Sequence, residues 1–175
     1  MRTLVTERLT LEPLEARHAE GMFGGLSDPE LHRFLVERPP ESVEWLRQRY
    51  ERLSTRQSDD GRELWWNWVL RLTHSGEFVG TVQATICERE AEVAYVVFRP
   101  YWSHGLAAEA MGAMIGELAG VGVTSICACT DRENLRSRRL LERLGFEERP
   151  LPEYRREDGA DDVWYVIEKG GAGKA

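Results

Sequence analysis

The stretch Phe98-Arg-Pro-Tyr-Trp-Ser-His-Gly-Leu-Ala-Ala-Glu-Ala-Met111 decides the fold of this chain. Pro100 prevents the preceding strand from continuing, and the pattern predicts a short loop followed by a helix that begins near Gly105. The free N–H groups and the dipole of a helix start attract anions, and the small residues Gly105 and Ala107 let a phosphate approach the backbone. The loop has neither the Walker pattern nor G-x-G-x-x-G, so spacing alone leaves open both an anion site and an ordinary strand-to-helix connection.

The hydrophobic pattern on both sides of this loop predicts a mixed α/β domain with helices on both faces of one sheet. Residues 64–98 are typical of an antiparallel meander, because apolar residues such as Trp66 and Trp68 recur at every second position. The helix after the loop contains Gly112 and Gly116, which we expect to pack closely on the sheet. The expected strands are 6–14, 64–72, 78–87, 91–98, 124–130, 151–154 and 163–168, and the expected helices are 16–26, 43–56, 105–120 and 134–144, with a further helical turn opened by Asp28.

Length, charge and cysteine content narrow the class of protein. The 175 residues suit one domain, expected over residues 1–169 with a flexible tail over 170–175. The 23 Lys and Arg residues against 30 Asp and Glu give a net charge of −7, which argues against nucleic-acid binding. No apolar run approaches about 20 residues and no signal-peptide core is visible, so no membrane segment is expected. Three cysteines, with no histidine cluster near Cys127 and Cys129, predict a reduced cytoplasmic protein without a zinc site.

Three blocks of sequence follow one another in an order and spacing typical of one enzyme superfamily. Trp102-Ser-His-Gly105-Leu-Ala107 resembles the [Q/R]-x-x-G-x-[G/A] loop of the GNAT N-acetyltransferases, with Trp102 where that pattern has Gln or Arg, and Ala107-Ala-Glu-Ala-Met111 resembles the helix start that follows it there. Thr6-Glu-Arg-Leu9 resembles the opening strand of the RimJ/RimL-like branch, the ribosomal-protein N-terminal acetyltransferases. Asn134-Leu-Arg-Ser-Arg-Arg-Leu-Leu-Glu-Arg-Leu-Gly-Phe146 resembles that branch's N-x-x-S-x-x-x-L-x-x-x-G-F helix, so the resemblance extends over about residues 3–168.

This resemblance implies a fold and a cosubstrate. The fold is that of the GNAT acyl-coenzyme A N-acyltransferases, a mixed and mostly antiparallel splayed sheet of about seven strands with helices on both faces. The cosubstrate is acetyl-coenzyme A, bound without a metal. In that family the pantetheine arm pairs with the strand before the loop, and the loop backbone grips the pyrophosphate. Carried over, these roles fall on Val96, Val97 and Phe98 for pantetheine and on Ser103, His104, Gly105, Leu106, Ala107 and Ala108 for pyrophosphate.

Glu92 is the candidate general base. It shares a strand face with Ala94, Val96 and Phe98, and a carboxylate among apolar neighbours is costly unless it is paired, hydrated or functional. Position alone favours a solvated glutamate near the turn at residues 88–90. The resemblance favours catalysis instead, because Ala91-Glu-Val-Ala-Tyr95 matches an A-E-[IV]-x-Y segment that carries a proposed catalytic glutamate in this branch.

Asn134 and Ser137 are the other candidate catalytic residues. Their spacing alone predicts that Asn134 caps the following helix, with Ser137 at its third position. The resemblance implies in addition that Asn134 contacts the cofactor and that Ser137 lies near the thioester sulfur as a candidate acid. Most arginines on this helix are expected to be solvated, and one of them could meet the ribose phosphate: Arg132, Arg136, Arg138, Arg139 and Arg143.

The sequence leaves the acetyl acceptor open. The leading hypothesis is direct acetyl transfer, in a ternary complex, to the N-terminal α-amino group of a protein or peptide. The alternatives are a small-molecule amine (an amino acid, polyamine or aminoglycoside) and an acyl-coenzyme A-binding regulatory module without turnover. The resemblance places the acceptor pocket in residues 22–58 and 150–162, where Trp45, Trp65 and Tyr154 are either lining or packing residues. The resemblance to this family is also compatible with a homodimer.

Overall fold

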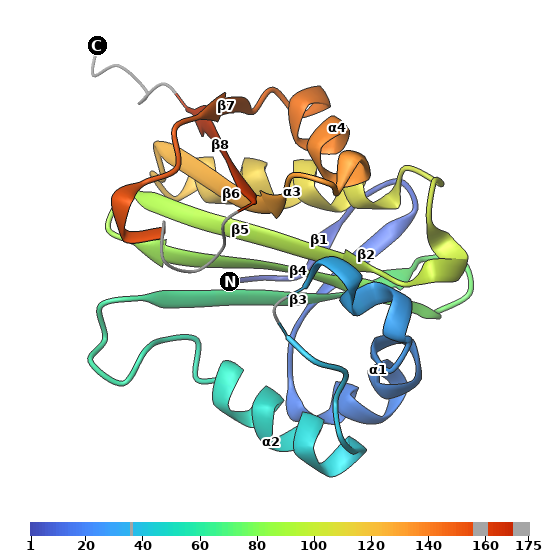
Figure 1. Ribbon diagram of the computed structural model, residues 1–175. Helices are drawn as coiled ribbons and strands as arrows, with labels where there is room; N and C mark the ends of the chain where they lie inside the picture. Colours follow the sequence, from blue (N-terminus) through green and yellow to red (C-terminus); the bar gives the residue numbers. More distant parts are fainter. Residues whose placement is uncertain (36, 156–160, 170–175) are drawn as a thin grey trace.

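The computed structural model describes residues 1–35, 37–155 and 161–169, and in them the strands form one mixed sheet (Figure 1). Every neighbouring pair of strands is antiparallel except β5 and β6. The strand order across the sheet is β1 (Leu4–Val5), β2 (Leu9–Pro13), β3 (Leu64–Leu72), β4 (Phe78–Cys87), β5 (Glu90–Val97), β6 (Ser125–Asp131), β8 (Asp162–Glu168) and β7 (Glu147–Arg149).

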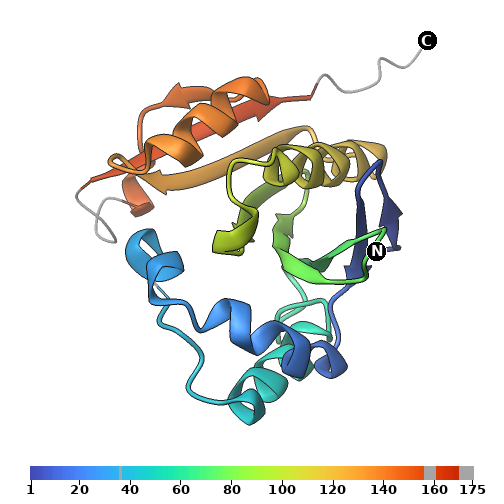
Figure 2. The same cartoon turned by 90° about the vertical axis from the view of Figure 1, so that its right-hand side faces the viewer.

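Helices cover both faces of the sheet, as Figure 2 shows. One face carries α1 (Ala19–Leu26) and α2 (Val43–Leu53), and the other carries α3 (Leu106–Gly120) and α4 (Leu135–Arg143). Four short 3-10 turns complete the described elements: η1 (Ala16–His18), η2 (Pro29–Phe34), η3 (Arg99–Tyr101) and η4 (Glu153–Arg155).

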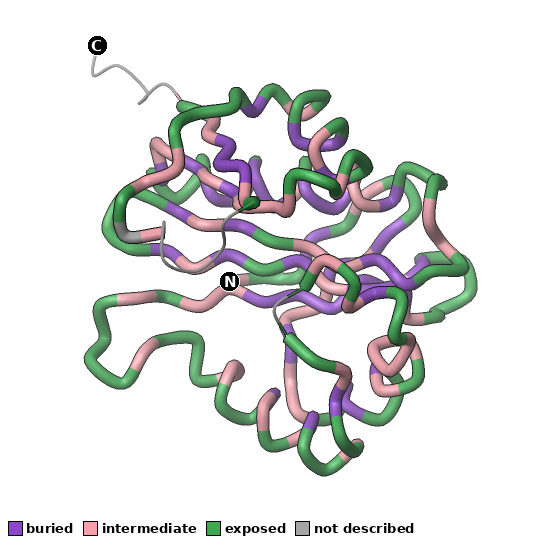
Figure 3. Tube along the Cα trace, viewed as in Figure 1, coloured by how far each residue is buried: buried purple, intermediate pink, exposed green. Residues whose placement is uncertain are grey.

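The period-2 pattern of β3 separates two hydrophobic cores. Trp68 and Leu70 are fully buried in the core on the α3 face, whereas Val69 belongs to the core under α1 and α2. The indole N–H of Trp68 donates to the carbonyl of Arg2 at 2.9 Å, so this buried ring keeps its polar atom satisfied. Figure 3 shows the buried positions gathered along the middle strands.

The sheet opens between its only parallel pair among the described strands. β5 pairs with β6 only over Glu90–Glu92 and Ser125–Cys127, and the two strands separate beyond Glu92. On the other side of β5, pairing with β4 continues as far as Val97, opposite Gly80. A Cβ at Gly80 would lie 2.0 Å from the carbonyl oxygen of Val96, so this close approach requires glycine. The expected splayed sheet is therefore present, and its gap begins directly after Glu92.

Three sequence predictions about the fold were wrong in detail. The expected first strand, 6–14, is shorter than predicted: β2 begins at Leu9, and the extra short strand β1 (Leu4–Val5) lies before it, which brings the expected seven or so strands to eight. The expected strand 151–154 is instead the region of η4, and the pairing strand is β7, since Pro150 and Pro152 cannot donate to a ladder. A Cβ at Gly112 or Gly116 would meet nothing within 4 Å, so these glycines do not pack on the sheet. The expected tail over 170–175 lies outside the described residues.

In the described ranges, no helix has the length and apolar character needed to cross a membrane. The same ranges contain no group of three or more His, Cys, Asp or Glu side chains placed to hold a metal ion.

Candidate active site

The gap between β5 and β6 forms a cavity of about 160 Å³. Its walls come from the separated halves of the two strands, from the turn η2, and from the first residues of α4. The lining includes Val93, Ala94, Tyr95, Val96 and Val97 of β5, Ala128, Cys129 and Thr130 of β6, and Asn134 and Ser137.

The alternation of β5 determines which backbone groups face this gap. The N–H of Phe98 donates to Val79 at 2.8 Å, which directs Phe98 and, by alternation, Val96 toward β4. Tyr95 and Val97 therefore present their backbone groups to the open side. The Val97 carbonyl already accepts a hydrogen bond from the Trp102 indole N–H at 2.6 Å. Of the three residues predicted to hold pantetheine, Val97 has its backbone turned to the gap.

A second cavity of about 480 Å³ lies beside the start of α3. Ser103 and Gly105 have positive φ values of 66° and 78°, so the backbone curls tightly before α3. A curled backbone at a helix N-terminus is a shape that binds anions. Among the residues predicted to grip pyrophosphate, Ser103, Gly105, Leu106 and Ala107 line this cavity. His104 and Ala108 are not part of its lining.

Arginines from α4 face the same cavity. Arg136, Arg139 and Arg143 line it, which places three positive charges opposite the loop. The Arg136 guanidinium lies 4.1 Å from the centroid of the Trp102 ring and so links α4 to the loop. Arg138 instead bonds to the Tyr165 hydroxyl at 3.1 Å and is not a lining residue. Phosphates fit this combination of curled backbone and guanidinium groups.

Glu92 is the last residue of β5 that pairs with β6. Its side chain is 35% exposed and forms an ion pair with Arg155 of η4. The Arg155 guanidinium also lies 5.8 Å from the centroid of the Trp164 ring. Glu92 is therefore neither fully solvated nor isolated among apolar groups. Sequence reasoning missed Arg155, because it comes from a charged segment 63 residues further along the chain.

Asn134 caps α4, as its spacing predicts. Its Oδ1 accepts the backbone N–H of Ser137 at 3.1 Å, and both residues line the gap. Ser137 is only 8% exposed. Burial raises the pKa of the Tyr95 hydroxyl, and the Ser137 side chain opposes that rise. Sequence reasoning gave Tyr95 no role, although it is the last residue of the Ala91–Tyr95 match.

Cys127 and Cys129 face the same side of β6 and are half-buried. Burial, and secondarily the charges of Glu92 and Asp162, raise the pKa of each thiol to about 12. A thiol in this state is a poor nucleophile near neutral pH. This agrees with a direct attack on the thioester rather than a cysteine acyl-enzyme.

A third cavity of about 80 Å³ lies on the α2 face of the sheet. It shares Leu35 and Val96 with the gap cavity, so the two adjoin. Trp45 lines it, whereas the Trp65 indole N–H bonds to Glu63 at 3.0 Å and Trp65 is not a lining residue. The side chain of Tyr154 and residues 156–160 of the expected acceptor segment lie outside the described residues.

Comparisons with known proteins agree with this geometry. A family model of the acetyltransferase (GNAT) domain matches residues 8–147. The chain is 29% identical over 155 residues to a Bacillus licheniformis protein named uncharacterized N-acetyltransferase p20, with 86% of this chain and 85% of that protein covered. It is 26% identical over 161 residues to the uncharacterized N-acetyltransferase YoaA of Bacillus subtilis (strain 168), with 89% of each chain covered.

Two solved structures show the same fold. A GNAT-family acetyltransferase from Bacillus anthracis superposes with a TM-score of 0.75 at 20% identity, over 95% of this chain and 98% of that one. A Vibrio cholerae structure that carries the proposed name ribosomal-protein-serine acetyltransferase gives a TM-score of 0.77 at 18% identity, over 95% and 97%.

Proposed function

The chain belongs to the GNAT family of acetyltransferases, and from this premise we propose that it transfers the acetyl group of acetyl-coenzyme A to the N-terminal α-amino group of a protein or peptide. One observation carries the proposal: the pairing of β5 with β6 ends at Glu92, one residue before Val93, the first residue of β5 that lines the gap expected to hold the thioester. The sequence blocks shared with the RimJ/RimL-like branch support an N-terminal acceptor, as does the proposed name of the Vibrio cholerae structure.

The gap cavity and the cavity beside α3 divide the binding of acetyl-coenzyme A, which supplies an activated acetyl group when bound. The loop from Ser103 to Ala107 and the guanidinium groups of Arg136, Arg139 and Arg143 would hold the phosphates. The open edge of β5 would hold the pantetheine arm, with the reacting end near Asn134 and Ser137.

Each protein group then has one task in the proposed reaction. Glu92 takes a proton from the acceptor amine, with Oε1 as the receiving oxygen because Oε2 is paired with Arg155. The N–H groups of Tyr95 and Val97 stabilise the negative charge that develops on the carbonyl oxygen. Ser137, which lines the gap, donates a proton to the departing sulfur. A thiol has a pKa of about 8.5, so this last step needs little acid help.

The acceptor determines how much work the base must do. An α-amino group with a pKa of about 7.8 costs about 1 kcal/mol to deprotonate at pH 7, whereas a lysine side chain with a pKa of about 10.4 costs about 4.6 kcal/mol. The N-terminal acceptor therefore asks less of the base.

Replacement of Glu92 by glutamine tests the assignment. We expect Glu92→Gln to lower kcat by about 100-fold while leaving the affinity for acetyl-coenzyme A unchanged. Glu90→Gln is the matched control, because Glu90 is an exposed carboxylate two residues away on the same strand. An unchanged kcat in Glu92→Gln would remove Glu92 from the reaction.

An acceptor screen separates this proposal from its alternatives. N-terminal peptides, polyamines and aminoglycosides are incubated with the protein and acetyl-coenzyme A, and products are identified by mass spectrometry. Acetylated peptide α-amines support the proposal. Exclusive acetylation of polyamines or aminoglycosides would assign a small-molecule enzyme, and binding without thiol release for any amine would assign a regulatory module.

A further inference from the structure

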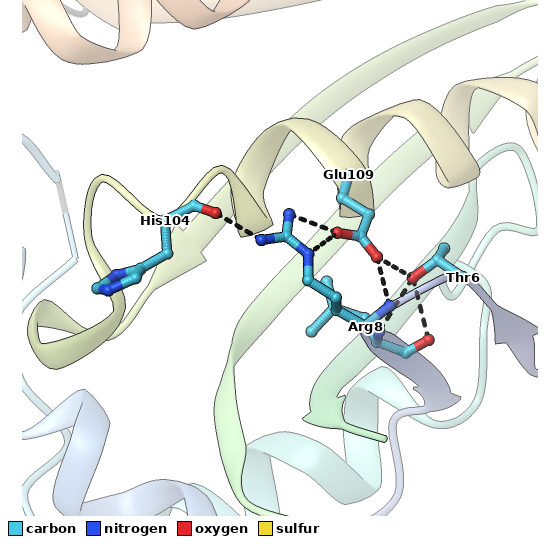
Figure 4. Close-up of polar contacts among 5 residues, drawn as sticks. Thr6, Arg8, His104 and Glu109 are labelled. Carbon is cyan, nitrogen blue, oxygen red and sulfur yellow. Dashed lines mark hydrogen bonds and ion pairs between the residues drawn. The ribbon is translucent and has the colours of Figure 1, made fainter. Parts of the chain in front are cut away.

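Arg8 and Glu109 join the start of the chain to the start of α3, as Figure 4 shows. The Arg8 Nε donates to one carboxylate oxygen of Glu109 at 2.7 Å, and the Arg8 backbone N–H donates to the other at 2.8 Å. The Thr6 hydroxyl donates to that second oxygen at 2.6 Å. Glu109 thus holds the turn between β1 and β2 against the first turn of α3, 101 residues away.

The same guanidinium reaches the loop that precedes α3. Its Nη1 donates to the carbonyl oxygen of His104 at 2.8 Å, while the imidazole of His104 points away from it (Figure 4). A Cβ built on Gly105 would lie 3.5 Å from Nη2, so the guanidinium lies beside the glycine, with space for about one carbon atom between them. Arg8 therefore bonds to one central residue of the loop and lies next to the other.

These contacts act on a segment that is otherwise strained. Ser103 is one of three non-glycine residues with positive φ in the described chain, and Gly105 follows it in the left-handed region. A strained backbone conformation persists only when contacts with the surrounding structure hold it in place. The His104 carbonyl and the Gly105 N–H belong to one trans peptide and point in opposite directions. Holding the carbonyl on the Arg8 side therefore directs the Gly105 N–H to the opposite side, and Gly105 is one of the residues that line the 480 Å³ cavity.

Arg8 is suited to positioning rather than to binding phosphate itself. Its charge is matched by Glu109, whose pKa is lowered because hydrogen bonds from Thr6 and Arg8 outweigh the effect of burial. Arg8 is not among the residues that line the phosphate-side cavity, which is faced instead by Arg136, Arg139 and Arg143. Its contacts are made from behind the loop.

We propose that Arg8 and Glu109 are positioning residues that hold the loop at Ser103–Gly105 in its anion-binding shape. The inference rests on the proposed binding of acetyl-coenzyme A at this loop. It gives a physical reason for the joint presence of Thr6-Glu-Arg-Leu9 and Ala107-Ala-Glu-Ala-Met111, because the polar residues of the two blocks bond to one another.

The test compares two ligands by calorimetry, acetyl-coenzyme A and acetyl-pantetheine, which lacks the pyrophosphate and nucleotide. We expect Arg8→Ala to bind acetyl-coenzyme A about tenfold more weakly and acetyl-pantetheine equally well, since the loop contacts only the phosphates. Arg8→Lys should behave like Arg8→Ala, because a single ammonium cannot bridge Glu109 and the His104 carbonyl as the guanidinium fork does.

Arg2→Ala is the matched control. Arg2 forms an ion pair with Glu117 on the same helix, at 2.8 Å, and so ties the same end of the chain to α3 away from the loop. It should leave the affinity for both ligands unchanged. Equal weakening by Arg2→Ala, or equal weakening of both ligands by Arg8→Ala, would show a structural role and overturn the proposal.

The comparison also separates this inference from the proposed function. If the unmodified protein binds the two ligands equally, both the loop assignment and the role of Arg8 are rejected. If it prefers acetyl-coenzyme A and Arg8→Ala abolishes the preference while no N-terminal peptide is acetylated, the positioning role stands and only the proposed acceptor is rejected.

Discussion

Asn134 offers a way to separate a helix cap from a catalytic contact, because the two roles use different atoms of one amide. Oδ1 accepts the Ser137 N–H at 3.1 Å, which occupies the oxygen, and the proposed cofactor contact would use the Nδ2 hydrogens. Asn134→Ala removes both groups. Asn134→Asp keeps an oxygen at the cap and removes only the donor.

The loss of the helix cap determines how much stability Asn134→Ala should lose. Loss of an N-cap side chain costs about 1 kcal/mol, and for a chain of this length that lowers Tm by about 2–4 °C. Aspartate caps a helix as well as asparagine does. In addition, its negative charge interacts with the helix dipole, which stabilises an exposed helix N-terminus by about 0.3–1 kcal/mol. We therefore expect Asn134→Ala to be destabilised and Asn134→Asp to match or slightly exceed the original Tm.

In contrast to their stabilities, the activities of the two variants should fall together. Both lose the Nδ2 donor, so both should show kcat/KM for acetyl-coenzyme A reduced by about fivefold or more, the worth of one hydrogen bond. Thermal denaturation and steady-state kinetics on the same preparations give the two readings. If Asn134→Asp retains the original kcat/KM, the amide hydrogens have no role in the reaction. If it is as unstable as Asn134→Ala, the cap does not account for the stability effect.

Three further predictions concern residues around the site. At pH 8, Cys127 and Cys129 should react with iodoacetamide far more slowly than exposed Cys87, because a pKa of about 12 leaves about one thiol in ten thousand ionised; equal labelling in a peptide map would refute this. The pKa of Glu109 is lower in the folded protein than its ordinary value of 4.5, so ionised Glu109 stabilises the fold above pH 4.5, and this stabilisation is lost as the pH falls through the folded-state pKa. The difference in free energy of unfolding between the original protein and Glu109→Gln, measured by urea titration, should therefore shrink on acidification below pH 4.5. Gly80→Ala should cost about 3 kcal/mol or more in free energy of unfolding, because its Cβ would meet the Val96 carbonyl oxygen; an unchanged denaturation midpoint would contradict the close approach.

Sequence reasoning correctly placed the helices and strands whose apolar residues repeat at a regular spacing. Every second residue of β3 from Trp68 to Leu72 packs in the same core, and the helix after Gly105 repeats its apolar residues at helical spacing, so their faces follow from geometry alone. The failed strand at 151–154 contradicts a rule that the sequence itself displays, since Pro150 and Pro152 cannot donate to a ladder.

The sequence could point to candidate site residues, which stay predictions, but it could not predict most of their contacts. The cap at Asn134 depends on neighbours in sequence, so spacing was sufficient to predict it, whereas the anion-binding role of the loop came from the resemblance. The partners of Glu92 and Arg8 come from 63 and 101 residues away, and a charged residue carries no local signal of which opposite charge the fold brings to it. Chain topology decides such pairs.

The ion pair between Arg155 and Glu92 also has a consequence for the acceptor. An ammonium group delivered to Glu92 would lie beside a guanidinium that remains charged at every accessible pH. A neighbouring cation lowers the pKa of an amine and so enriches its neutral, nucleophilic form. In the proposed reaction, the arginine would thus begin the deprotonation electrostatically and leave the carboxylate to finish it. The same charge would repel acceptors that carry several ammonium groups, so the pair would act as a filter on substrate charge.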